Sequence, residues 1–249
     1  MIFAGIDSAT LGVQALPQAG VFLSDTDDDT FALPGVDGQR WLRSTQTPRE
    51  FPVRLRARAE SAAALRAKLD AVTAWLASGP ALLVFDELPD RAWTARRRGA
   101  LAWTLDGGTF RVATDVLFVA DDPHPYAIAD DITVLAAPGD ALRHVGNAPS
   151  WPRIDITGAL TASQSVTVSL WGQQVTMSGP LAAGEIARLD YPEFLFTVVN
   201  GAGAVLRNLA PRLSTLRRVS CPVGGGPVSW TLTGGSITQI RIEANSRWL

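Results

Sequence analysis

The chain has 249 residues, of which 47% are hydrophobic and 18% are charged, and its formal net charge is −2. This composition is typical of folded domains, and the near-neutral charge argues against general electrostatic binding to nucleic acid or to an anionic membrane. Cys221 is the only cysteine, which excludes an internal disulfide and a cysteine-rich zinc site, and no apolar stretch reaches the roughly 18 residues of a membrane span.

The first half of the chain is predicted to form short strands around one helix. Residues 51–57 alternate apolar and basic side chains, which is the period of a half-buried strand. Ser61 is a favoured N-cap residue, and Gly79-Pro80 ends the helical pattern. Between them, apolar side chains recur at spacings of three and four, which predicts a stripe that packs on a sheet: Leu65, Leu69, Val72 and Leu76.

A domain boundary is expected in the turn-rich segment 126–149, and we place the two domains at residues 1–135 and 136–249. The second half reads as all-β. Its predicted strands follow one another at intervals of about ten residues with Gly, Pro or Asn between them, a rhythm typical of sandwiches and barrels.

No pattern in the sequence indicates catalysis or a cofactor. The two histidines, His124 and His144, lie in Pro- and Gly-rich connecting sequence, and no Gly-x-Ser-x-Gly elbow supplies a nucleophile for a Ser-His-Asp triad. Surface-loop histidines are the favoured interpretation. Glycoside hydrolysis needs two carboxylates at a set distance, which a sequence alone does not show. Three acidic residues that are close together in the sequence, Asp86, Glu87 and Asp90, flank a predicted turn at Pro89. We predict a protein that is not an enzyme and holds no metal or cofactor.

Two charged runs require an interpretation. The acidic run 25–29 resembles the start of a calcium loop, but Thr30 and Val36 stand where that loop needs Gly and Glu, so a solvated loop is favoured. The basic run Arg96, Arg97 and Arg98 is interpreted either as a solvated hairpin turn or as an intersubunit contact.

The order of several short motifs resembles the distal tail proteins of long, flexible-tailed phages. In the first half these motifs are the helix end Trp75-Leu76, residues 88–93 (LPDRAW) and residues 121–126 (DDPHPY). In the second half they are residues 147–158, 184–190 and 237–249. The chain departs from the family where residues 222–226 replace a Pro-Gly-x-Asn-like turn, and where the aromatic residue expected at Ala92 has moved to Trp93.

The resemblance implies a structural hub of a phage or phage-like tail tip. The first domain would be a β-sandwich with one helix and an extended hairpin, and the second a galectin-like β-sandwich. Six copies would form a ring in the virion tail, made and assembled in the host cytoplasm. That ring would join the tail tube protein to the tail-associated fibre or lysin protein, and some family members also hold a receptor-binding protein.

The arm of such a ring is expected in the segment after the acidic run, where two turn signals, Pro34-Gly35 and Asp37-Gly38, fall close together. An arm with exposed aromatic residues becomes favourable once a neighbour covers it. The expected contacts are Phe31, Leu33 and Trp41, with Arg96–Arg98 opposite the acidic run of the next subunit.

Two other functions compete with the hub. A carbohydrate-binding module is the alternative, because galectin-like sandwiches can stack sugars on Trp. The sequence has no His after His144 to complete a galectin-type sugar site. A wall-degrading hydrolase of the tip is disfavoured because no metal or nucleophile motif is present.

Overall fold

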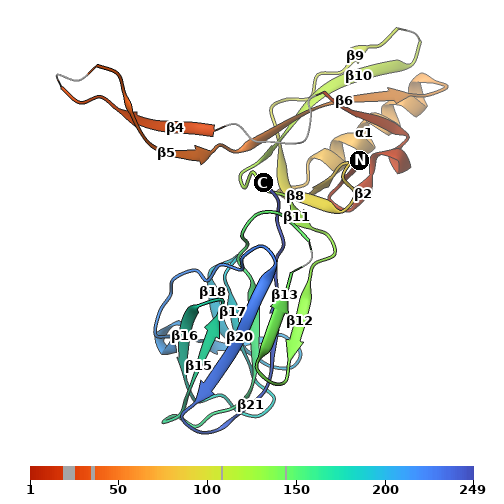
Figure 1. Cartoon of the computed structure of the whole chain (residues 1–249). Helices are drawn as coiled ribbons and strands as arrows, with labels where there is room; N and C mark the ends of the chain where they lie inside the picture. The colour runs from red at the N-terminus through yellow and green to blue at the C-terminus, as the bar shows by residue number, and fades with distance from the viewer. Residues whose placement is uncertain (19–25, 35–36, 108, 144) are drawn as a thin grey trace. The chain divides into compact units, whose positions relative to one another are not determined.

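The structure is a computed structural model that describes residues 1–18, 26–34, 37–107, 109–143 and 145–249 (Figure 1). Its contacts divide the chain into two compact units, Met1–Pro125 and Tyr126–Leu249. Antiparallel strands dominate both units, and the described residues contain one α-helix, so the mainly-β prediction with a single helix is confirmed. None of the described helices has the length and apolar character needed to span a membrane.

The first unit is built on one hydrogen-bonded run of antiparallel strands in the order β2-β1-β7-β8-β10-β6-β3, with β9 paired to β10. A short 3₁₀ helix, Ser8–Leu11, leads from β2 into β3. The strands are β1 (Ile2–Phe3), β2 (Ile6–Asp7), β3 (Val13–Pro17), β6 (Arg49–Arg58), β7 (Ala81–Val84), β8 (Arg91–Arg98), β9 (Thr104–Leu105) and β10 (Arg111–Ala120).

Strand β6 shows how the sequence pattern becomes a two-sided sheet. Its apolar side chains at Phe51, Val53 and Leu55 are buried, while the arginines at the alternate positions 54, 56 and 58 point to the opposite face. It pairs with β10 over its whole length, from Arg49 opposite Ala120 to Arg58 opposite Arg111. The predicted strand at residues 51–57 is therefore the centre of a longer one.

Helix α1 (Ala62–Leu76) begins as predicted at Ser61, whose Oγ accepts a hydrogen bond from Ala64 N at 3.2 Å. Its buried side chains are Val72, Trp75 and Leu76. Leu65 and Leu69 are only partly buried at the margin of the core, so the predicted stripe is displaced towards the C-terminal half of the helix. Trp75 Nε1 donates to Phe3 O at 2.8 Å, which fixes the helix against β1.

Strands β4 (Thr26–Phe31) and β5 (Arg40–Gln46) form a separate two-stranded ribbon. Within the described chain each of these strands pairs only with the other. All six residues of β4 are exposed, as are the first six of β5. An isolated hairpin of this kind is at best marginally stable in water.

The second unit is a two-sheet β-sandwich (Figure 1). One sheet has the order β12-β21-β14-β17-β18-β19, the other the order β13-β20-β15-β16. A 3₁₀ helix, Ala210–Arg212, follows β19. The strands are β11 (Tyr126–Ala127), β12 (Ile132–Leu135), β13 (Gly139–Leu142), β14 (Arg153–Ala159), β15 (Ser165–Leu170), β16 (Gln173–Ser178), β17 (Ile186–Asp190), β18 (Leu195–Val199), β19 (Val205–Asn208), β20 (Gly225–Leu232) and β21 (Ser236–Glu243).

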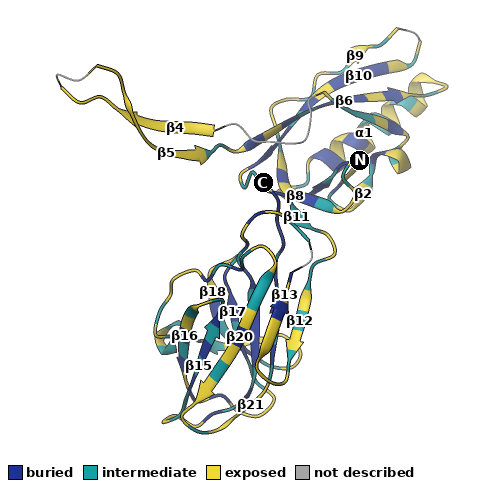
Figure 2. Ribbon diagram, viewed as in Figure 1, coloured by how far each residue is buried: buried dark blue, intermediate teal, exposed yellow. Residues whose placement is uncertain are grey.

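The facing sides of the two sheets share one apolar core, with buried residues such as Ile154, Val168 and Ile240. Figure 2 shows the resulting alternation of buried and exposed residues along the strands. The expected domain border at 135/136 differs from the division between Pro125 and Tyr126 that the contacts give. Strand β12 pairs with β21 and so belongs to the second unit. The galectin-like character of this sandwich stays a prediction.

An ion pair ties strand β19 to the turn before β17. The Glu185 carboxylate accepts from the Arg207 guanidinium, with Arg207 NH1 2.7 Å from Oε1, and also from Ala182 N at 2.8 Å. The hydrogen bond from Arg207 lowers the pKa of Glu185 from 4.5 to about 2.

The sign of this shift fixes the pH range in which the ion pair acts. A lowered pKa in the folded state stabilises the protein above the unfolded value near 4.5, and that contribution is lost as the pH falls towards 2. We expect Glu185→Gln to lower the free energy of unfolding at neutral pH and to leave the stability less dependent on pH between 4.5 and 2. Urea titrations of both proteins at several pH values measure this, and parallel pH profiles would contradict it.

Candidate assembly surfaces

The reactive side chains considered first are Cys221 and the two histidines. The Cys221 thiol is buried, and burial raises its pKa to about 11. His124 Nδ1 lies 3.1 Å from Asp122 Oδ1, and His144 lies outside the described residues. Among the described residues no group of three or more His, Cys, Asp or Glu side chains could hold a metal ion.

Two of the sequence motifs have a structural role in the first unit: one forms a turn, and the other is hydrogen-bonded to the core. At the first, Leu88 N donates to Phe85 O at 3.0 Å, and Arg91 N donates to Leu88 O at 3.2 Å, so the LPDRAW phrase makes a turn that leads into β8. At the second, Trp93 is fully buried and its Nε1 donates to Pro123 O at 3.2 Å, which attaches the DDPHPY phrase to the core.

The basic run Arg96–Arg98 lies at the end of strand β8, not in a turn. Along this strand the more buried Ala95 and Arg97 alternate with exposed neighbours. The three arginines also pair with residues 117–119 of β10. Arg96 and Arg98 form ion pairs within the chain, with Asp121 at 3.2 Å and Glu50 at 3.1 Å. Arg97 Nε donates to Leu76 O at 3.2 Å. Much of this predicted interface charge is thus already neutralised.

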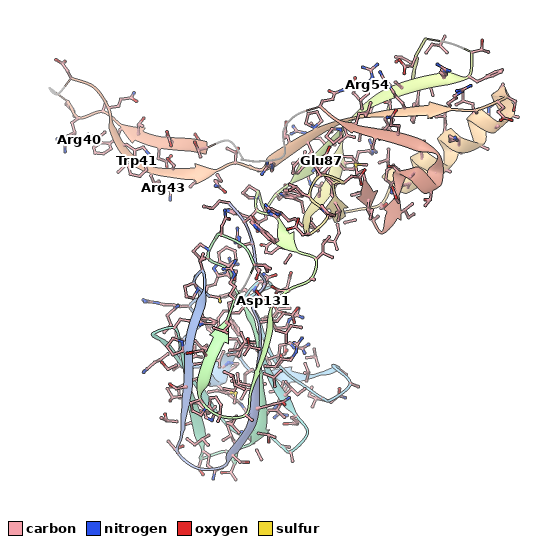
Figure 3. The ribbon with its side chains drawn as sticks, turned by 45° about the vertical axis from the view of Figure 1, so that its right-hand side comes forward. Arg40, Trp41, Arg43, Arg54, Glu87 and Asp131 are labelled. Carbon is pink, nitrogen blue, oxygen red and sulfur yellow. The ribbon has the colours of Figure 1, made fainter. Side chains whose placement is uncertain are left out.

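The ribbon β4–β5 carries the exposed apolar side chains predicted for an arm. Trp41 is 62% exposed and Leu42 is 60% exposed, while Phe31 and Leu33 are near 37% and 38%. Figure 3 shows Arg40, Trp41 and Arg43 as side chains of this ribbon. Large apolar groups exposed on a marginal hairpin are unfavourable in water and make this ribbon a candidate contact surface.

The indole of Trp41 is held in place by hydrogen bonds within the ribbon. Its Nε1 donates to Ser44 Oγ at 3.1 Å, and that hydroxyl donates to Asp28 Oδ1 across the strand pair. On the other face, Arg43 Nε lies 2.6 Å from Asp29 Oδ2. Asp28 and Trp41 therefore share one face of the ribbon, where a carboxylate stands beside an oriented aromatic ring.

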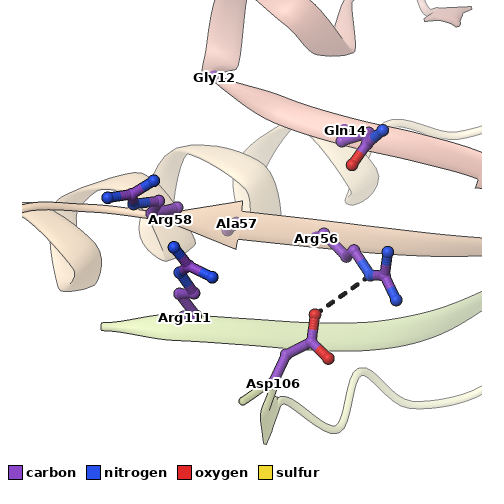
Figure 4. Close-up of a pocket in the computed structure, with 7 residues that line it drawn as sticks. All are labelled: Gly12, Gln14, Arg56, Ala57, Arg58, Asp106 and Arg111. Atoms are coloured by element: carbon purple, nitrogen blue, oxygen red, sulfur yellow. Dashed lines mark ion pairs between the residues drawn. The ribbon is translucent and has the colours of Figure 1, made fainter. Parts of the chain in front are cut away.

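A second surface, which the sequence did not single out, lies on the outer face of β3, β6 and β10. A hollow of about 380 Å³ is lined there by Gly12, Gln14, Arg56, Ala57, Arg58, Asp106 and Arg111 (Figure 4). Arg56 Nε lies 3.1 Å from Asp106 Oδ2, and Arg54 NH1 lies 3.9 Å from Asp115 Oδ1. The alternation at residues 51–57 predicts a basic side for this strand, but it does not show which side chains of other strands lie beside it.

Comparisons with known proteins agree with the resemblance. Residues 6–102 match the family model of the phage tail protein RIFT-related domain. No curated protein sequence matches the chain.

Among solved structures, the phage SPP1 Dit protein, described as a paradigm of the hub adsorption apparatus in phages that infect Gram-positive bacteria, is similar with a TM-score of 0.74 and 16% identity. That similarity covers 100% of this chain and 98% of the SPP1 protein. A chain of the phage P2 baseplate in its activated conformation with calcium is similar with a TM-score of 0.53 and 10% identity, covering 95% of this chain and 92% of that one.

At these identities the similarity to solved structures establishes a fold. The predicted resemblance is confirmed by that fold together with the match of residues 6–102. Residues 6–102 thus resemble the phage tail protein RIFT-related domain, and the chain as a whole has the fold of the SPP1 Dit protein.

Proposed function

We propose that this chain is the structural hub subunit of a phage or phage-like tail tip. Six copies form a ring in the virion tail, assembled in the host cytoplasm. The ring joins the tail tube protein on one side to the tail-associated fibre or lysin protein on the other, and it can also hold a receptor-binding protein. Its role is mechanical, with no catalytic step.

The ribbon β4–β5 is the observation that carries this proposal. It forms a sheet of its own and exposes Trp41 and Leu42 by 62% and 60%, which is unfavourable for a monomer and favourable once a neighbouring subunit covers it. Phe31, Leu33 and Trp41 are the proposed contacts. Arg96–Arg98 belong to the proposed interface as well, although Arg96 and Arg98 would have to exchange their present partners Asp121 and Glu50.

The carbohydrate-binding alternative is not favoured. Stacking of sugars needs a free aromatic face. In the second unit Trp151 is held between the guanidinium groups of Arg218 and Arg247, which lie 4.4 Å and 4.7 Å from its ring centroid. The remaining tryptophans of this unit pack at least partly into it: Trp171, Trp230 and Trp248.

Native mass spectrometry of the purified chain tests the hub. We expect a closed ring of six copies, because the distal tail protein fold and the uncovered ribbon both point to self-assembly. A strict monomer at high protein concentration, together with binding to bacterial surface glycans, would instead establish the carbohydrate-binding function.

A further inference from the structure

The chain has two surfaces of opposite charge that are only partly neutralised within it. The acidic ribbon, residues 26–46, carries four aspartates (Asp27, Asp28, Asp29 and Asp37) against two arginines (Arg40 and Arg43). The basic face, on the outer side of β3, β6 and β10, carries four arginines (Arg54, Arg56, Arg58 and Arg111) against two aspartates (Asp106 and Asp115). Each surface therefore has two charges in excess, of opposite sign.

The excess on the basic face is concentrated at one cross-strand pair. Arg58 on β6 stands directly opposite Arg111 on β10, and both side chains are exposed at the rim of the hollow (Figure 4). Like charges in directly opposed positions destabilise a sheet. Among the described residues, no acidic side chain forms an ion pair with either of them. A carboxylate brought by a partner would relieve the repulsion between these two guanidinium groups.

The excess negative charge of the ribbon lies beside Trp41. Asp27 forms no ion pair among the described residues, and Asp28 accepts only from the neutral Ser44 hydroxyl. Asp28 and the oriented Trp41 are on the same face. The basic hollow, of about 380 Å³, is lined by Gln14, Arg56, Arg58 and Arg111, which leaves room for a ring between arginines. Guanidinium groups bind both to carboxylates and to indole faces.

We propose that the basic face of one subunit receives the acidic ribbon of a second copy of this chain. Trp41 enters the hollow between β3, β6 and β10, and Asp27 and Asp28 approach Arg58 and Arg111. This rests on the proposed ring, and it names the surface that the arm grips. It also replaces Arg96–Arg98 as the main electrostatic partner, since Arg96 and Arg98 are already paired.

A second copy explains the basic face better than a nucleic acid does. Asp106 and Asp115 lie on the same face and neutralise two of its four arginines, leaving little positive charge for a phosphate backbone. The ribbon provides a matching number of carboxylates together with an aromatic side chain for the hollow. Exposed charge pairs of this kind act mainly on specificity and association rate, so reversing them should be decisive for assembly.

Charge-swapped variants test the proposal. The ribbon variant is Asp27→Arg with Asp28→Arg, and the face variant is Arg58→Glu with Arg111→Glu. Each is purified alone, the two are mixed in equal amounts, and a third protein carries all four changes. Assembly is measured by native mass spectrometry and sedimentation velocity at low ionic strength, where exposed charges are screened least.

We expect each double variant alone to associate at least 100-fold more weakly than the wild-type protein, because its ribbon and face then carry like charges. The mixture should form rings that contain equal numbers of both variants, since each ribbon now finds an oppositely charged face. The protein with all four changes should form rings by itself.

Three results would overturn the proposal while leaving the hub function intact. The first is that the double variants assemble alone like the wild-type protein, and the second is that their mixture fails to assemble. The third is that the protein with all four changes assembles although the mixture does not, which would place the contact within one chain. A wild-type chain that remains monomeric would refute the hub function itself. If a reversed variant melts at a lower temperature than the wild-type monomer, the neutral variants Asp27→Asn/Asp28→Asn and Arg58→Gln/Arg111→Gln are used in its place. Each neutral variant is expected to associate at least tenfold more weakly than the wild-type protein.

Discussion

Replacing Trp41 and Leu42 together by alanine is expected to abolish the ring while leaving both units folded. The two side chains are 62% and 60% exposed on a ribbon that pairs with no other described strand, so their removal costs the monomer little. In the assembled ring they would be buried anchors. Truncating one such anchor weakens association by about 2 kcal/mol or more, roughly 30-fold, and a closed ring loses this at every subunit contact.

Sedimentation velocity over a range of protein concentrations measures this effect. The control is Leu105→Ala, which removes an apolar side chain of the same size as Leu42 that is 81% exposed elsewhere in the first unit. The control should sediment as the wild-type ring does. If Trp41→Ala/Leu42→Ala still forms rings of wild-type stability, the arm is not an anchor, and the subunit contacts must lie on the sheets of the two units.

Placing a charge at Val72 should have the largest effect on stability. This side chain is 0% exposed on the sheet-facing side of α1, beside Trp75 and Leu76. Val72→Asp would bury a carboxylate without a partner, which is expected to cost about 3–5 kcal/mol. Because whole domains are stable by only about 5–15 kcal/mol, the first unit would be largely unfolded at moderate temperature.

The control for this change is Ala71→Asp, one residue earlier on the exposed side of the same helix. Thermal unfolding followed by tryptophan fluorescence reports on the first unit through the buried Trp75 and Trp93. We expect Ala71→Asp to melt close to the wild-type temperature and Leu69→Asp to fall between the two, since Leu69 is only partly buried. Equal melting temperatures for Val72→Asp and Ala71→Asp would show that α1 does not pack as described.

Local patterns in the sequence predicted the elements well. The alternation at residues 51–57 identified the centre of β6, and Ser61 identified the start of α1, because both signals depend on near neighbours in the chain. The position of the helix on the sheet was less accessible. In the structure Trp75 lies on the buried face, and Leu65 and Leu69 lie at its margin. The sequence pattern does not show this, because the tilt of a helix depends on the surface on which it packs.

The candidate surfaces were predicted unevenly for a similar reason. The exposed arm residues could be expected from turn signals around Pro34 and Gly38. The basic face could not, because Arg58 and Arg111 meet only through the register of β6 with β10, and no local pattern fixes a pairing of strands more than 50 residues apart. The pairing of β8 with β10 likewise brings Arg96 and Arg98 near Asp121 and Glu50, which lie far from them in the sequence.

The ribbon β4–β5 also has a consequence for newly made subunits that have not yet met a partner. A two-stranded ribbon leaves rows of backbone N–H and C=O groups on its outer edges, which are templates for uncontrolled strand addition and aggregation. Three consecutive aspartates, Asp27–Asp29, stand on β4. Two such ribbons approaching edge to edge repel each other. We therefore expect the carboxylates that we assign to docking also to disfavour edge-to-edge pairing of free subunits.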